Sequence, residues 1–116
     1  EKQTVFMIYR ARQKLLLEKR PSRGIWGGLW CFPENTVSQK DRLMIASGTH
    51  HRVELPQLRH TFTHFRLWIH PQLIEVNTEM SDPEKMTVWI APEEALDLAI
   101  PAPVKKLIVQ HFLNDL

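Results

Sequence analysis

Two short segments of this 116-residue chain concentrate residue types that bind anions, metals or nucleic acids. The first, "RPSRGIWGGLWCFPEN", spans residues 20–35 and combines cations with three glycines and two tryptophans. The second, "LRHTFTHFRL", spans residues 58–67 and interleaves His, Arg and Thr with Phe. Glycine-rich loops can cradle phosphates, and basic segments with aromatic residues can bind nucleic acid, although both also serve as plain structural anchors.

The first segment has the composition of a rigid loop. Its glycines permit positive φ angles and a sharp, closely packed turn. Trp26 and Trp30 can bury large areas and so pin this turn to a sheet. Three cations beside the loop are candidate phosphate contacts, namely Lys19, Arg20 and Arg23.

The second segment offers either a metal pair or a nucleic-acid contact. His60 and His64 have a spacing that suits zinc on a helix, but this segment reads as strand–turn–strand and has no third ligand nearby, so we expect no metal. Isolated histidines are also common as core or surface residues. The alternative interpretation is a nucleic-acid contact, in which hydrogen-bond donors hold phosphates and base edges and aromatic rings pack or stack. The residues that would take part are Arg59, His60, Phe62, Thr63, His64, Phe65 and Arg66.

The remaining sequence predicts the elements that must position these segments. Six apolar and β-branched stretches predict strands. They are Thr4–Arg10, Lys14–Arg20, Leu29–Phe32, Arg52–Phe62, Phe65–Val76 and Met86–Ile90. Capping signals and amphipathic spacing predict helices over residues 35–48, 92–98 and 103–116. This order indicates an α/β (α+β) fold in which helices sandwich a mixed β-sheet on both faces.

The strand predicted over residues 65–76 has two different faces. Phe65, Leu67 and Ile69 make one face, and Arg66, Trp68 and His70 make the other. Pro71 cannot donate a hydrogen bond to a ladder, so we expect a bulge or an edge position there.

Charge is unevenly distributed, although the net charge is only +2. Residues 1–31 hold seven Lys or Arg and two Asp or Glu, whereas residues 77–116 hold three and seven. A basic front can face an anionic partner, but charge alone favours the interpretation as a solvated surface.

Cysteine use and hydropathy limit the classes of protein. The single Cys31 cannot form an internal disulfide, which fits a reducing cytoplasm. No apolar run approaches the roughly 20 residues that span a bilayer, so we expect no membrane partner. Because the chain starts at Glu1 and enters a predicted strand at once, we expect residues 1–116 to be a single domain excised from a longer chain.

The stretch "LLLEKRPSRGIWGGLWCFPE" resembles the start of a Nudix-type domain. Members that are hydrolases continue with the pattern G-x5-E-x7-R-E-x-x-E-E-x-G, whose carboxylates hold a divalent cation. The 17 residues after Pro33, "ENTVSQKDRLMIASGTH", offer only Glu34 and Asp41. The resemblance therefore implies a Nudix-like fold without Nudix catalysis and without a metal.

Together, "RPSRGIWGGLWCFPE" and "LRHTFTHFRL" resemble the C-terminal domain of the bacterial A/G-specific adenine DNA glycosylase (MutY) family. This resemblance covers nearly the whole chain, including the closing "APVKKLI". The family's Phe-Ser-His loop falls on Phe62, Thr63 and His64, with Thr in place of the usual Ser. In the family this loop approaches 8-oxoguanine and helps to distinguish it from guanine.

The resemblance implies a lesion-recognition domain that acts in base excision repair. Its partners would be double-stranded DNA containing 8-oxoguanine:A and its own N-terminal catalytic domain, which would carry the catalytic carboxylates and a [4Fe–4S] cluster. This domain itself would hold no cofactor and would not act as an enzyme, and we expect a monomer at the bacterial nucleoid. The candidate contacts are Phe62, Thr63 and His64, supported by Arg59, His60 and Arg66.

Two alternatives remain open at this point. One is a Nudix pyrophosphohydrolase of oxidised nucleotides, which the missing carboxylates disfavour. The other is a Nudix-like protein-interaction module that uses an exposed Trp68 or Trp89.

Overall fold

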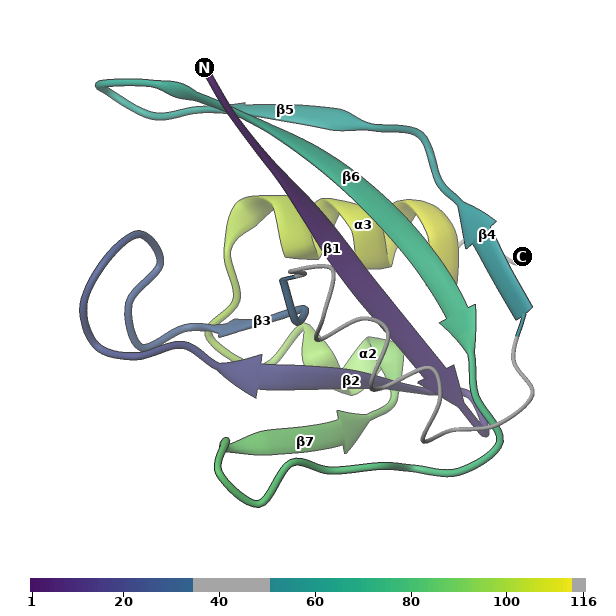
Figure 1. Ribbon diagram of the computed structural model, residues 1–116. Coiled ribbons are helices and arrows are strands. Elements are labelled where there is room, and N and C mark those ends of the chain that lie inside the picture. The colour runs from purple at the N-terminus through teal and green to yellow at the C-terminus, as the bar shows by residue number, and fades with distance from the viewer. Residues whose placement is uncertain (35–50, 114–116) are drawn as a thin grey trace.

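The computed structural model describes residues 1–34 and 51–113, and their strands form one seven-stranded mixed sheet (Figure 1). The strands are β1 (Lys2–Ala11), β2 (Lys14–Lys19), β3 (Trp30–Cys31), β4 (His51–Glu54), β5 (Leu58–Thr61), β6 (Arg66–Glu75) and β7 (Thr87–Ile90). The sheet has the order β3-β2-β1-β6-β4, while β5 also pairs with β6 and β7 pairs with β2. The mixed sheet predicted from the sequence is therefore confirmed.

The two long strands at the centre, β1 and β6, run parallel over nine aligned residue pairs from Lys2–Leu67 to Arg10–Glu75. All other named strand pairs are antiparallel. The strands β1 and β2 form a hairpin, and its turn residues Arg12 and Gln13 have φ angles of 53° and 67°. Two consecutive positive φ angles match the right-handed twist of the strands they join.

Pro71 lies where the pairing of β6 with its neighbours β4 and β5 is interrupted. The strand predicted over residues 52–62 is two strands, β4 and β5, and both pair with β6. Their break lies opposite Pro71, where the amide of Leu55 donates to the Pro71 carbonyl at 3.0 Å. The expectation of an edge strand or a bulge is wrong for β6, because its register with β1 is continuous through Pro71. The missing amide hydrogen is accommodated by breaking the neighbouring strand instead.

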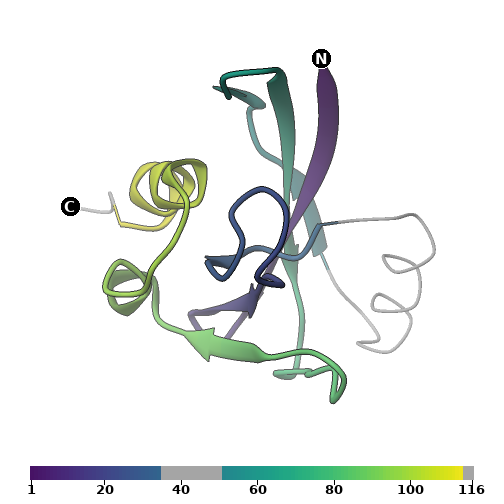
Figure 2. The same cartoon turned by 90° about the vertical axis from the view of Figure 1, so that its left-hand side faces the viewer.

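The described helices cover one face of the sheet (Figure 2). They are α2 (Pro92–Ala95), which is shorter than predicted, and α3 (Ala102–Phe112). Val104, Leu107 and Ile108 of α3 are buried against β1, β2 and β6 side chains. Neither of these helices is long and apolar enough to cross a membrane. The helix predicted over residues 35–48 and the last residues of the closing helix lie outside the described part of the chain.

The opposite face of the sheet is also apolar. Met7, Tyr9, Leu16 and Ile74 are buried there, and Trp89 packs against them. A sheet with buried side chains on both faces is typical of a layered α/β arrangement.

Candidate nucleic-acid interface

The connection between β5 and β6, residues 62–65, is a short turn that we call the tip loop. The Phe62 amide donates to the Phe65 carbonyl at 2.8 Å, and the two rings stack with centroids 4.7 Å apart. This pairing closes the turn and leaves Thr63 and His64 exposed at its end. Two predicted contact residues are therefore presented to solvent on a base of stacked aromatic rings.

The first segment forms the connection between β2 and β3, residues 20–29, which we call the glycine loop. Gly24 and Gly28 have φ angles of 86° and 77°, and the Gly28 amide donates to the carbonyls of Arg20 and Pro21 at 3.2 and 3.1 Å. A Cβ on Gly27 would lie 2.5 Å from the Ser22 carbonyl oxygen. The loop thus folds tightly onto itself, as its composition predicts.

Trp26 joins the glycine loop to the tip loop. Its ring centroid lies 5.5 Å from that of Phe62, 5.8 Å from that of His60 and 6.2 Å from that of the buried Phe6. His60 and Phe62 also meet edge to face at 4.7 Å. Two segments some 30 residues apart in sequence therefore share one aromatic cluster, on the same side of the molecule (Figures 1 and 2). His60 contributes to this scaffold.

Arg20, the first residue of the glycine loop, fixes the loop through three contacts. It pairs with Glu34, donates from Nε to the Ile25 carbonyl at 3.1 Å and lies over the Trp26 ring. Burial acts to lower the pKa of Arg20, but the hydrogen bond and charge of Glu34 outweigh it and raise that pKa. Thr4 donates a 2.6 Å hydrogen bond to the other oxygen of Glu34. Arg20, predicted as a phosphate contact, is thus already engaged inside the protein.

Arg59 and Arg66 lie on the other face of the hairpin from His60, because side chains alternate along a strand. Arg59 is directly opposite Trp68 in the sheet, and its guanidinium lies 5.5 Å from that ring centroid. Arg66 and the Trp68 indole Nε1 both donate to the Glu1 carboxylate, at 3.5 and 3.2 Å. The hydrogen bond from Trp68 is the main cause of the lowered pKa of Glu1.

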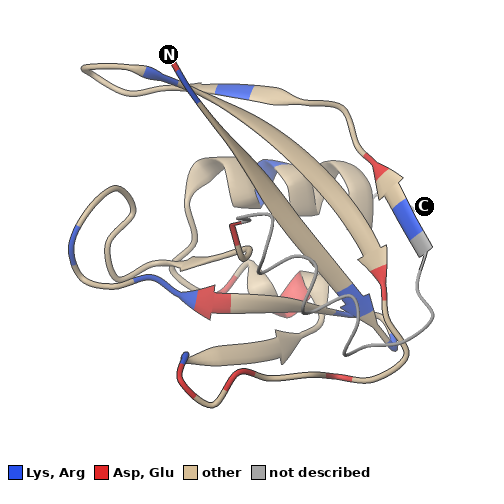
Figure 3. Ribbon diagram, in the orientation of Figure 1, with Lys and Arg blue, Asp and Glu red and all other residues tan. Residues whose placement is uncertain are grey.

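Three further cations are exposed on the side of the molecule that carries both loops (Figure 3). Lys19 ends β2, Arg23 lies in the glycine loop, and the Lys2 Nζ lies 4.7 Å from the centre of the Phe65 ring. Sequence reasoning missed Lys2, because only the parallel pairing of β1 with β6 brings it to the tip loop. The acidic segment after β6 runs along the lower part of the view and ends beside the end of β2, where Lys85 pairs with Glu18 and the Lys19 amide donates to the Met86 carbonyl (Figure 3).

The described residues do not fit a metal site. None of them form a group of three His, Cys, Asp or Glu side chains that could hold an ion. Glu34 is occupied by Thr4 and Arg20, and Asp41 lies outside the described range. Burial raises the pKa of Cys31 to about 12, which favours the protonated thiol over the reactive thiolate at neutral pH.

The two tryptophans considered for protein contacts are less exposed than expected. Both Trp68 and Trp89 are half-buried, and each has its indole hydrogen bonded. Trp89 donates to the Met80 carbonyl at 2.7 Å. Because both indoles are partly buried and already hydrogen bonded within the chain, the alternative of a protein-interaction module that uses them is weakened.

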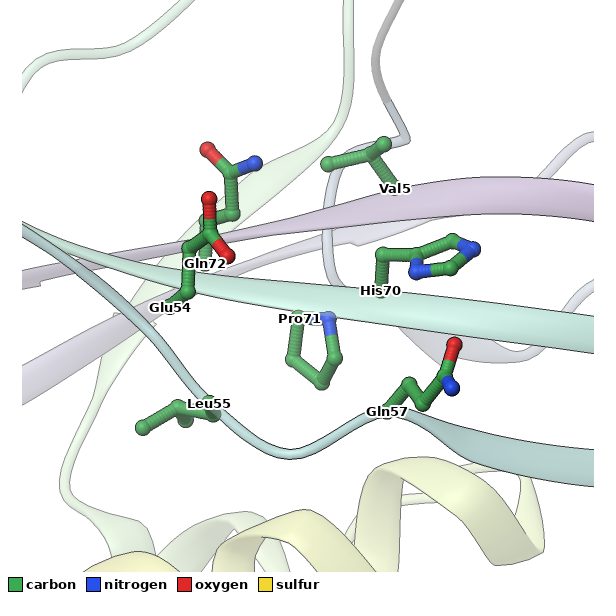
Figure 4. Close-up of a pocket in the computed structure, with 7 residues that line it drawn as sticks. All are labelled: Val5, Glu54, Leu55, Gln57, His70, Pro71 and Gln72. Atoms are coloured by element: carbon green, nitrogen blue, oxygen red, sulfur yellow. The ribbon is translucent and has the colours of Figure 1, made fainter.

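A hollow of about 400 Å³ lies where the connection between β4 and β5 passes β6 (Figure 4). Its lining consists of Val5, Glu54, Leu55, Gln57, His70, Pro71 and Gln72. The His70 ring nitrogen Nε2 lies 2.8 Å from Gln3 Oε1. The hollow contains none of the predicted contact residues, so it is distinct from the tip loop.

Comparison with known proteins gives one family and several relatives. The family of NUDIX domains matches residues 4–110. Two adenine DNA glycosylases of Buchnera aphidicola, from subspecies Baizongia pistaciae and Schizaphis graminum, are 28% and 25% identical over 110 and 115 residues. The alignments cover 90% and 93% of this chain but only 31% and 33% of those relatives. The chain therefore spans about a third of their length.

A solved structure has the same fold. The C-terminal domain of mouse MUTYH, determined in complex with human PCNA, superposes with a TM-score of 0.70 at 16% identity. The match covers 94% of this chain and 86% of the mouse domain. The Nudix-like architecture inferred from the sequence is thus confirmed.

Proposed function

The chain belongs to the family of NUDIX domains, and from this premise we propose that it is the lesion-recognition domain of a longer adenine DNA glycosylase. The observation that carries the proposal is the tip loop, in which Thr63 and His64 are exposed on a stacked aromatic base. The relatives named adenine DNA glycosylase support it, since they match this chain over most of its length.

The proposed ligand is 8-oxoguanine paired with adenine in duplex DNA. Compared with guanine, 8-oxoguanine carries a carbonyl at C8 and a hydrogen on N7, so its N7 edge donates instead of accepting. The Thr63 hydroxyl or a tip-loop carbonyl can accept that hydrogen. A carbonyl opposite guanine would place two acceptors face to face, whereas the hydroxyl discriminates only while its own hydrogen is donated to another acceptor. One such mismatch is worth about 1–3 kcal/mol, or roughly 10- to 100-fold in preference.

Positively charged side chains around the tip loop and the glycine loop favour binding to DNA. Lys2, Lys19 and Arg23 are exposed around the two loops and can contact phosphates without reading sequence. Arg59 and Arg66 add positive charge to the far face of the hairpin. Because this attraction releases counterions, we expect binding to weaken as salt increases.

The adenine excision itself would belong to an N-terminal catalytic domain of the same polypeptide. That domain would hold the [4Fe–4S] cluster, since this chain has one cysteine and it is buried. The protein would act as a monomer in the bacterial cytoplasm, on nucleoid DNA. The Nudix-like domain would bind the opposite strand while the adenine is flipped out of the duplex.

The test is the double variant Thr63→Ala/His64→Ala in the full-length enzyme. We expect the preference for 8-oxoguanine:A over G:A, measured as single-turnover adenine excision, to fall roughly 10- to 100-fold. Thr78→Ala, an exposed threonine in the segment after β6, is the matched control and should retain the preference. An equal loss on both duplexes, or no loss, would contradict the proposal.

The hydrolase alternative has its own measurement. The chain is incubated with oxidised nucleoside triphosphates and Mg²⁺ or Mn²⁺, and pyrophosphate is assayed. We expect no release, since Glu34 is held by Arg20 and Thr4. Metal-dependent release would revive the alternative.

A further inference from the structure

The backbone of Trp26 has a conformation that its side chain does not favour. Its φ angle is 56°, in the left-handed region where residues with a Cβ are uncommon. The flanking loop fixes this conformation, since the Leu29 amide donates to the Trp26 carbonyl at 3.1 Å and Arg20 binds the Ile25 carbonyl at 3.1 Å. Such a conformation persists only where the surrounding structure over-determines it, and it frequently marks a functional position.

The unusual backbone places the indole against the base of the tip loop. Trp26 contacts two residues of the hairpin. They are His60 in β5, two residues before the tip loop, and Phe62, the first residue of the tip loop. Phe62 in turn stacks on Phe65, so a continuous row of rings runs from the glycine loop to both ends of the turn. The exposed Thr63 and His64 lie between these two stacked rings in sequence, and the Phe62–Phe65 backbone hydrogen bond closes the turn around them.

We infer that Trp26 is a positioning residue for lesion discrimination: it holds Phe62, and through Phe62 it fixes the orientation of Thr63 and His64. This inference rests on the proposed function of the tip loop. The physical reason is that an acceptor discriminates between a donor and an acceptor on a base only while its distance and angle are fixed. A turn closed by the Phe62–Phe65 hydrogen bond needs a packed support to supply that rigidity, and Trp26 supplies it through its contact with Phe62.

The glycine loop therefore has a function even though it carries no hydrolase chemistry. Arg20 and the glycine-rich backbone hold Trp26, and Trp26 in turn supports the tip loop. Glu34 takes part through Arg20, which pairs with it and lies over the Trp26 ring.

The test compares Trp26→Leu with Trp89→Leu in the full-length enzyme. Both tryptophans are half-buried, but Trp89 packs on the opposite face of the sheet from the tip loop. We expect Trp26→Leu to reduce the preference for 8-oxoguanine:A over G:A about tenfold or more, with excision from G:A largely retained. Trp89→Leu should retain the preference, and Trp26→Phe, which keeps a ring against Phe62, should restore much of it.

A second measurement tests the positioning step by itself. In the 116-residue chain, the amide NMR signals of Thr63 and His64 should shift and broaden with Trp26→Leu and not with Trp89→Leu. Unchanged signals and an unchanged preference would overturn the inference. If the wild-type enzyme shows no preference, the proposed function fails, while the NMR comparison still decides the role of Trp26. If Trp26→Leu does not fold, Trp26→Phe takes its place, and it should then show a partial loss of preference and smaller shifts.

Discussion

The glycine loop and the tip loop lie side by side and are built in opposite ways. The glycine loop is held by several backbone hydrogen bonds, positive φ angles and the Arg20–Glu34 pair. The tip loop is closed by the backbone hydrogen bond from Phe62 to Phe65, and its end residues Thr63 and His64 are exposed. Under the proposed function, the first loop would therefore contribute mainly to stability and the second mainly to recognition.

This division has a physical basis. A residue that reads a ligand must leave its polar atoms unpaired until the ligand arrives, so it contributes little to folding. A residue that supports it must be packed and hydrogen bonded, so its loss costs folding free energy. Substitutions in the two loops should therefore separate stability from selectivity.

The largest effect on stability is expected from Gly27→Ala. The new Cβ would lie 2.5 Å from the Ser22 carbonyl oxygen, and a backbone atom cannot move aside easily. We expect a loss of about 2–3 kcal/mol in the free energy of unfolding, measured by urea denaturation. Gly28→Ala meets no atom within 4 Å but retains a φ of +77°, so it should cost only about 1–2 kcal/mol. Equal costs would show that crowding at Ser22 is unimportant.

A smaller effect is expected from Glu34→Gln. The amide keeps an acceptor for Thr4 but loses the charge that pairs with the half-buried Arg20. We expect a loss of about 1–2 kcal/mol by thermal or urea unfolding. Glu79→Gln, an exposed carboxylate after β6, is the control and should change stability by less than about 0.5 kcal/mol. A neutral Glu34→Gln would mean that the Arg20–Glu34 pair does not anchor the loop.

The smallest effect on stability is expected from Thr63→Ala/His64→Ala. Both side chains are exposed, so the free energy of unfolding should change by less than about 0.5 kcal/mol, measured by the same urea titration. A cost of several kcal/mol would show that the tip loop supports the fold, and the contrast between the two loops would disappear. A stable variant that has lost selectivity would sharpen that contrast.

Much of the fold follows from local sequence pattern. Alternation over residues 65–76 placed Leu67 and Ile69 in the core and Arg66, Trp68 and His70 on the other face, as the structure has them. Pro71 was the exception. Its place in a central strand could not be predicted, because it depends on the break between β4 and β5, which are paired with β6 only in the folded chain.

The sequence predicts the two loops of the candidate site separately, without the contacts that join them. The exposure of Thr63 and His64 agrees with a turn between two strands, and the tight glycine loop agrees with its composition. Arg20 was grouped with Lys19 and Arg23 as a free cation, since a sequence does not show that Glu34 lies beside it. The segment of residues 35–48, predicted as a helix, lies outside the described residues and stays a prediction.

The sequence by itself determined the mixed sheet, the tight glycine loop and the absence of a carboxylate cluster after Pro33, because these depend on residue types and on spacing over a few positions. Tertiary structure alone decided that Trp26 meets His60 and Phe62, that Lys2 meets Phe65 and that Arg59 meets Trp68. These contacts join residues that are distant in the chain. The pairing of β1 and β5 with β6 brings the strand residues together, and the left-handed backbone of Trp26 turns its ring toward them.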